Sequence, residues 1–183
     1  LFNQYVVPSY GRKPVAFTRG KGTKIWDAEG KVYLDFLSGI AVTALGHSHP
    51  AFCAAVSRQA EQLVHTSNLY YIEKQGLLAR ELSELSLKGK CFFCNSGAEA
   101  NEALIKLARL WGSARKRFEI VTMRNSFHGR TLATLAATGQ TKHQAGFEPL
   151  PTGFVYADFN DLESVKSAIN ANTCAVLLEA VQG

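Results

Sequence analysis

Residues suited to binding an anion stand where a predicted helix begins, in the run Asn95-Ser96-Gly97-Ala98. The first backbone N–H groups of a helix have no partner within the helix, and the aligned peptide dipoles place positive potential there. Gly97 lets the backbone approach an anion closely, and the Ser96 hydroxyl offers a further donor. Because the short apolar run 91–94 precedes this turn, the order strand, turn and helix start predicts a phosphate-binding turn.

The same turn also fits a purely structural role. Ser96 and Glu99 have the spacing of a capping box, in which each side chain satisfies a backbone N–H of the other residue. Many helices begin in this way without any ligand, so the spacing alone leaves both interpretations open.

A second run of residues that could bind a ligand follows the predicted strand 119–123. It is Asn125-Ser126-Phe127-His128-Gly129-Arg130-Thr131. Its aromatic pair offers a flat ring that can stack on a heterocycle. The Arg130 guanidinium can hold a carboxylate through two parallel hydrogen bonds. The alternative is a core Phe127, an exposed His128 and an arginine that merely starts a helix.

An acid, Glu179, closes the continuous apolar strand predicted over residues 174–179. A carboxylate at the end of a buried strand is costly unless a cation or hydrogen-bond donors face it. We therefore expect partners for Glu179 at this strand end, and a solvent-facing loop carboxylate is the alternative.

The four cysteines are Cys53, Cys91, Cys94 and Cys174. The Cys91-x-x-Cys94 spacing is compatible with a redox pair or with half of a zinc site. No second pair of zinc ligands follows at a matching spacing, so no metal site is expected. The two thiols flank a pair of phenylalanines in an apparent strand, which favours buried thiols in a core strand.

The elements that must position these residues change character along the chain. Residues 1–45 read as a β-rich segment, with strands over 15–19, 23–27 and 31–35 in an antiparallel meander. From residue 46 to 183, apolar periodicity alternates between helices at 51–63, 74–85, 97–115, 131–137 and 161–169 and strands at 91–94, 119–123, 153–157 and 174–179. This alternation predicts an α/β fold with a mostly parallel sheet and helices on both faces, which binds ligands at the carboxyl ends of its strands.

Composition excludes several classes of partner. The 183 residues are 46% hydrophobic and 19% charged, with a net charge of +5 and no long basic run, so neither nucleic acid nor a membrane is an expected partner. No run is long and apolar enough to span a bilayer, and no signal-peptide pattern is visible. Four thiols fit a cytoplasmic location best.

Taken together, the motifs resemble those of the class III pyridoxal-phosphate aminotransferases, and most closely the acetylornithine branch of that family. The resemblance covers essentially the whole chain and is carried by motifs that occur in the family's order: residues 45–50 (Leu-Gly-His-Ser-His-Pro), 65–69 (His-Thr-Ser-Asn-Leu), 95–103 (Asn-Ser-Gly-Ala-Glu-Ala-Asn-Glu-Ala), 106–109 (Lys-Leu-Ala-Arg), 126–131 (Ser-Phe-His-Gly-Arg-Thr) and 179–183 (Glu-Ala-Val-Gln-Gly).

This resemblance implies roles for individual residues. Pyridoxal 5'-phosphate would be bound by the backbone of Gly97 and Ala98 with Ser96 adjacent, and Phe127 would stack on its ring. His128 and Glu179 would lie in the cofactor site, and Arg130 would pair with the α-carboxylate of the substrate. Residues 1–45 would belong to the small domain of the family fold and residues 46–183 to its large domain.

The resemblance also predicts a reaction and marks what the chain lacks. The enzyme would move the ω-amino group of N-acetylornithine to 2-oxoglutarate in arginine biosynthesis, as a homodimer. Ile40 stands where ornithine aminotransferases carry tyrosine, which favours an acylated substrate; succinylornithine, ornithine and 4-aminobutyrate stay open. Family members are about twice as long, and their Schiff-base lysine lies beyond the position of Gly183, so we expect a fragment that is inactive alone. A non-catalytic phosphate-binding module and a thiol redox protein are the alternatives.

Overall fold

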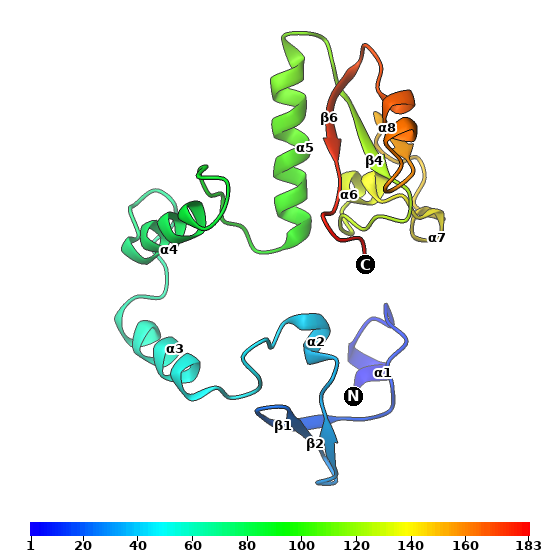
Figure 1. Cartoon of the computed structure of the whole chain (residues 1–183). Coiled ribbons are helices and arrows are strands. Elements are labelled where there is room, and N and C mark those ends of the chain that lie inside the picture. Colours follow the sequence, from blue (N-terminus) through cyan, green and yellow to red (C-terminus); the bar gives the residue numbers. More distant parts are fainter. The chain divides into compact units, whose positions relative to one another are not determined.

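The computed structural model describes residues 1–183 and divides them into two units, Leu1–Gly76 and Leu77–Gly183. Figure 1 shows the elements of each unit. No helix in either unit combines the length and the apolar character that crossing a bilayer requires. Because all of the predicted cofactor-site residues lie in the second unit, the first is described only briefly.

The first unit contains the predicted antiparallel meander. Its elements are α1 (Phe2–Tyr5), β1 (Phe17–Lys21), β2 (Lys24–Asp27), β3 (Val32–Leu34), α2 (Ser38–Ala41) and α3 (Pro50–Gln62), and α4 (Glu73–Glu84) runs across the boundary between the units. The strands pair in the order β1-β2-β3. The Asp27 carboxylate closes the turn between β2 and β3, since it accepts hydrogen bonds from the N–H groups of Glu29 and Lys31 and from the Tyr33 hydroxyl.

The second unit is a parallel α/β layer structure. Three strands, β4 (Glu119–Met123), β5 (Phe154–Ala157) and β6 (Thr173–Leu177), form a sheet in the order β5-β4-β6, and both pairings are parallel. The helices are α5 (Gly97–Ser113), α6 (Leu132–Ala137), α7 (Thr141–Gln144) and α8 (Leu162–Ala168). Figure 1 shows α5 running beside β6, with α8 across the sheet from it. This arrangement confirms the predicted α/β fold.

The central strand β4 is buried on both faces, and its side chains alternate between two apolar clusters. Ile120 packs with Ile105 of α5 and Ala137 of α6. Val121 and Met123 face the opposite way and pack with the α8 side of the sheet. Successive strand side chains point to opposite faces, so a four-residue stretch supplies both cores and holds the end of β4 in one place.

One predicted strand is absent. Residues 91–94 are extended but pair with no other strand, and Phe92 is 70% exposed. The expectation of buried thiols there was wrong, because Cys91 and Cys94 are both free and exposed. A strand exists only through hydrogen bonds to a neighbour, and residues 91–94 pair with neither of the two edge strands, β5 and β6.

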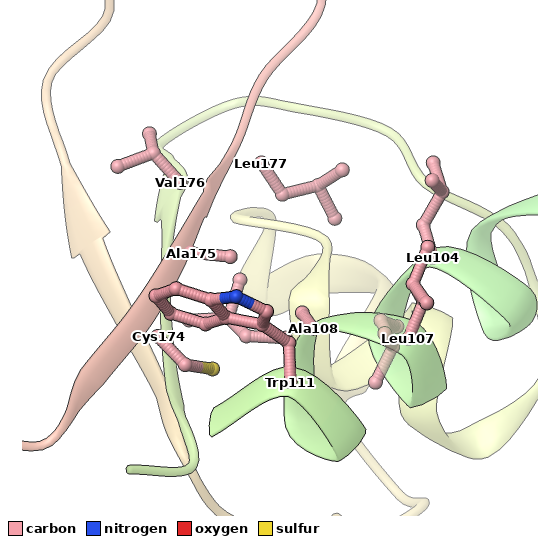
Figure 2. A pocket seen from close by; sticks show the side chains of 10 residues that line it. Leu104, Leu107, Ala108, Trp111, Cys174, Ala175, Val176 and Leu177 are labelled. Atoms are coloured by element: carbon pink, nitrogen blue, oxygen red, sulfur yellow. The ribbon is translucent and has the colours of Figure 1, made fainter. Parts of the chain in front are cut away.

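The predicted burial of β6 on both sides was also wrong, because β6 lies at the edge of the sheet and Val176 is 40% exposed. Figure 2 shows the apolar hollow that results, with a volume of about 490 Å³, between α5 and β6. Leu104, Leu107 and Trp111 of α5 line it on one side, and Cys174, Ala175, Val176 and Leu177 of β6 on the other.

Candidate active site at the ends of β4 and β6

The helix α5 begins at the predicted turn, and two hydrogen bonds define its start. Ser96 is the N-cap, and its Oγ accepts from the Glu99 N–H at 3.2 Å. The Glu99 carboxylate accepts from the N–H of Asn95 at 2.6 Å, one residue earlier than a capping box requires. The predicted hydrogen bond to the Ser96 hydroxyl is therefore confirmed, whereas the Glu99 carboxylate bonds the N–H of Asn95 and not that of Ser96.

This cap leaves free the groups that an anion needs. The backbone N–H groups of Gly97 and Ala98 are paired with no acceptor in the chain. A Cβ added at Gly97 would meet nothing within 4 Å, so the backbone there is open to an approaching group. The Ser96 oxygen acts as an acceptor in the cap, which leaves its own proton available to donate. The turn fits a phosphate by its donors and by its space.

The loop that follows β4 and leads into α6, residues 124–131 (the β4–α6 loop), packs directly against the start of α5. Gly129 has φ +137°, and a Cβ added to it would lie 2.9 Å from the Ala98 Cβ and 2.6 Å from the Thr134 Oγ1. Asn101 of α5 donates from Nδ2 to the His128 carbonyl at 2.7 Å. The close approach of the two segments therefore requires glycine at position 129.

Along the β4–α6 loop, side chains alternate between the interior and the surface. Ser126 and His128 are buried, at 0% and 4% exposure, whereas Phe127 is 45% exposed and Arg130 is exposed. The Arg130 guanidinium carbon lies 5.5 Å from the centroid of the Phe127 ring. A partly open aromatic face and a cation thus project from the same short loop.

Glu179, two residues beyond β6, reaches the β4–α6 loop. Its Oε2 accepts from the Phe127 N–H at 3.3 Å, which is the kind of partner that a strand-end carboxylate needs. Burial lowers the pKa of His128 below its ordinary value, although the nearby Glu179 carboxylate acts in the opposite direction. The imidazole is accordingly held in its neutral form.

The structure thus brings the predicted site residues to one end of the sheet. Gly97 and Ala98 open α5, Phe127 and Arg130 project from the loop that packs on it, and Glu179 joins them from the end of β6. The His128 ring is the exception, since it points into the core toward Thr122 of β4. The individual binding roles stay predictions.

Sequence reasoning missed the polar residues that hold the β4–α6 loop. They are Asn101, Thr122, Thr134, Thr138 and Gln140. One signal was available for Thr122, because it is the only hydroxyl in the buried strand β4 and is itself 0% exposed. A buried polar side chain of this kind requires a partner.

Comparison with known proteins agrees with this geometry. The model of the family described as "Aminotransferase class-III" matches residues 5–183. The acetylornithine aminotransferase of Caldanaerobacter subterraneus is 52% identical over 183 residues, which cover 98% of this chain and 47% of that protein. The chain therefore spans about half the length of the curated relatives that it matches.

Solved structures show the same fold. The ornithine aminotransferase of Toxoplasma gondii, described with partial occupancy of pyridoxal phosphate, superposes with a TM-score of 0.91 at 31% identity and covers 100% of this chain and 44% of its own. The N-acetylornithine aminotransferase of Stenotrophomonas maltophilia gives a TM-score of 0.77 at 37% identity, with coverages of 100% and 45%. Class III aminotransferases depend on pyridoxal phosphate. The chain belongs to the class III aminotransferases.

Proposed function

We propose that this chain supplies the phosphate- and ring-binding part of a pyridoxal-phosphate aminotransferase that moves the ω-amino group of N-acetylornithine to 2-oxoglutarate. The observation that carries the proposal is the convergence of three segments, because the β4–α6 loop touches both the first turn of α5, through Gly129 and Ala98, and Glu179 after β6. Relatives named acetylornithine aminotransferase support the choice of substrate.

In this proposal the N–H groups of Gly97 and Ala98, with the Ser96 hydroxyl, bind the cofactor phosphate at the positive end of α5. Phe127 stacks on the cofactor ring, and Glu179 fixes the Phe127 backbone through the hydrogen bond to its N–H. Arg130 binds a substrate carboxylate and so orients the reacting amine. When bound, pyridoxal phosphate supplies the electron sink for the reaction.

Several parts of the proposal concern the whole enzyme. We propose that it acts in arginine biosynthesis, in the cytoplasm and as a homodimer. Residues 1–45 are assigned to the small domain and residues 46–183 to the large domain. None of the lysines in residues 1–183 is assigned the role of holding the cofactor through a Schiff base.

Cofactor binding is tested by titrating the complete gene product with pyridoxal phosphate and following protein fluorescence. Replacing Phe127 with leucine removes the stacking surface, and we expect weaker binding by about 0.5–1.5 kcal/mol. Phe147→Leu is the matched control, because Phe147 is similarly exposed but outside the site. Equal affinities for the two variants would remove Phe127 from the cofactor site, and a wild-type protein that does not bind the cofactor would contradict the whole proposal.

Substrate binding is tested at the two arginines of the β4–α6 loop. Arg130→Gln should weaken binding of N-acetylornithine by about 1.5–3 kcal/mol, since a charge-assisted hydrogen bond is lost. Arg124→Gln is the control, because Arg124 already pairs with Asp158 at 3.1 Å. If both variants raise KM equally, Arg130 does not hold the substrate.

The identity of the amino donor is tested separately. We expect kcat/KM to be highest for N-acetylornithine among N-acetylornithine, N-succinylornithine, ornithine and 4-aminobutyrate. Ile40→Tyr should move the preference toward ornithine, because tyrosine offers a hydroxyl to a polar, non-acylated substrate. A preference for free ornithine in the wild-type enzyme would overturn this assignment.

A further inference from the structure

The β4–α6 loop carries Phe127 and Arg130, and His128, which follows Phe127, is bonded at three points to three different segments. The His128 ring Nε2 lies 3.1 Å from the Thr122 Oγ1 of β4. Its backbone N–H donates to the Thr138 Oγ1 at 2.9 Å, just after α6. Its carbonyl accepts from Asn101 of α5 at 2.7 Å. His128 is therefore one point at which the loop is fixed to three neighbouring segments.

The direction of the ring hydrogen bond follows from its partners. The Thr122 Oγ1 also lies 2.8 Å from the Ala137 carbonyl, and a carbonyl oxygen can only accept. The single hydroxyl proton of Thr122 therefore goes to Ala137. A lone pair of Thr122 Oγ1 then accepts the Nε2–H of His128, which assigns the ring tautomer.

The rest of the loop leaves Phe127 dependent on this contact. Ser126 is held by a bond from the Gly139 N–H and by one from the Gln140 side chain to its carbonyl. Phe127 itself has a single exposed bond, at 3.3 Å, to Glu179. Phe127 and Arg130 stand one and two residues from this buried imidazole, close enough for its position to influence where both of them project.

From this geometry we infer that His128 is a positioning residue: its ring, held by Thr122, fixes the turn that presents Phe127 to the cofactor and Arg130 to the substrate. The expected effect on cofactor and substrate binding rests on the proposed function, whereas the contact between His128 and Thr122 forms without any cofactor. His128 acts through Phe127 and Arg130 rather than by touching the cofactor.

The test removes the Thr122 hydroxyl with little change of volume. In the complete gene product, Thr122→Val should raise the Kd for pyridoxal phosphate about tenfold, because a buried polar group loses its partner. Thr122→Ser keeps the hydroxyl and should bind within about twofold of wild type. The control is Thr173→Val in β6, whose hydroxyl bonds only Asn170 and which should leave the affinity unchanged.

Two further measurements separate positioning from a general loss of stability. Visible circular dichroism of the bound cofactor should change in Thr122→Val and His128→Leu, but not in Thr173→Val. In the cofactor-free protein, amide exchange of residues 125–131 should become faster in the same two variants. The double variant Thr122→Val/His128→Leu should bind pyridoxal phosphate no more weakly than the weaker-binding single variant, since both substitutions remove the same contact.

The outcomes are distinct for the two proposals. If the wild type does not bind pyridoxal phosphate, the proposed function fails, while the exchange measurement still tests the role of His128. If the wild type binds and Thr122→Val behaves like Thr173→Val in affinity and in exchange, the positioning role is overturned. Should Thr122→Val not fold, His128→Gln, which keeps a donor, and His128→Leu are compared instead, and equal affinities overturn the role.

Discussion

Two segments border the predicted phosphate turn, and they are held in opposite ways. In the β4–α6 loop, backbone groups of Asn125, Ser126, Phe127 and His128 are bonded to side chains from three other segments. In residues 91–96, which precede α5 (the pre-α5 segment), the N–H groups of residues 92–94 donate to nothing in the chain. The β4–α6 loop is therefore held by hydrogen bonds within the chain, whereas the N–H groups of residues 92–94 are not.

The difference shows what makes part of a site rigid before any ligand arrives. The β4–α6 loop follows a central strand with neighbours on both sides, so its first residue is fixed in space. Thr122 of β4 then bonds the His128 ring in the interior, and Thr138 and Asn101 bond the His128 backbone. The pre-α5 segment has comparable apolar side chains but no strand beside it, and Phe92 is 70% exposed. Hydrophobicity alone does not order a segment without a partner.

The largest expected effect comes from closing the space between the β4–α6 loop and α5. Gly129→Ala should lower the free energy of unfolding by about 3 kcal/mol, since it adds backbone strain to contacts at 2.6 and 2.9 Å. Gly146→Ala, also at positive φ but with open space, should lose only about 1 kcal/mol. Urea denaturation measures both, and equal losses would show that the close packing is not needed.

The accessibility of the thiols tests the other side of the comparison. In the 183-residue chain, Cys91 and Cys94 should react with a thiol reagent faster than Cys174, which is half-buried. Burial also raises the pKa of the Cys174 thiol, which lowers its reactive thiolate fraction. Mass spectrometry of the labelled protein gives the order of reaction, and labelling of Cys174 first would contradict the exposed position of the pre-α5 segment.

Smaller effects are expected at the two N-caps. Thr131 caps α6 and bonds Glu102 at 2.5 Å and Thr134 at 2.7 Å, whereas Ser96 makes one exposed bond. Thr131→Val should cost about 1–2 kcal/mol and Ser96→Ala about 0.5 kcal/mol. Thermal unfolding of the two variants compares them directly. A larger loss of stability in Ser96→Ala than in Thr131→Val would contradict the view that the β4–α6 loop is the more firmly held of the two segments.

The smallest effect is a pH dependence from His128. Its folded-state pKa is lowered by burial, so the unfolded chain binds more protons as the solution is acidified. The stabilisation from the neutral ring is complete above about pH 6.5 and is lost as the pH falls from there through the folded-state pKa. His128→Leu should flatten this part of the unfolding free-energy curve relative to wild type, and an unchanged slope would contradict the burial of a neutral ring.

Local periodicity was sufficient to predict most elements of the fold. Strand 119–123 and the meander in residues 1–45 were found because alternation and turn residues are local signals. Residues 91–94 failed because pairing depends on a distant neighbour that apolar character does not reveal. The burial of the His128 ring could not be predicted either, since it depends on the Thr122 hydroxyl reaching it from the adjacent strand.

Amide hydrogen exchange in the cofactor-free chain tests the comparison most directly. The N–H of His128, bonded to Thr138 in the interior, should exchange at least about a hundredfold more slowly than the unbonded N–H of Phe93, because its exchange requires local opening. That result would establish that the β4–α6 loop is ordered before any ligand binds. Equal exchange at the two amides would contradict it.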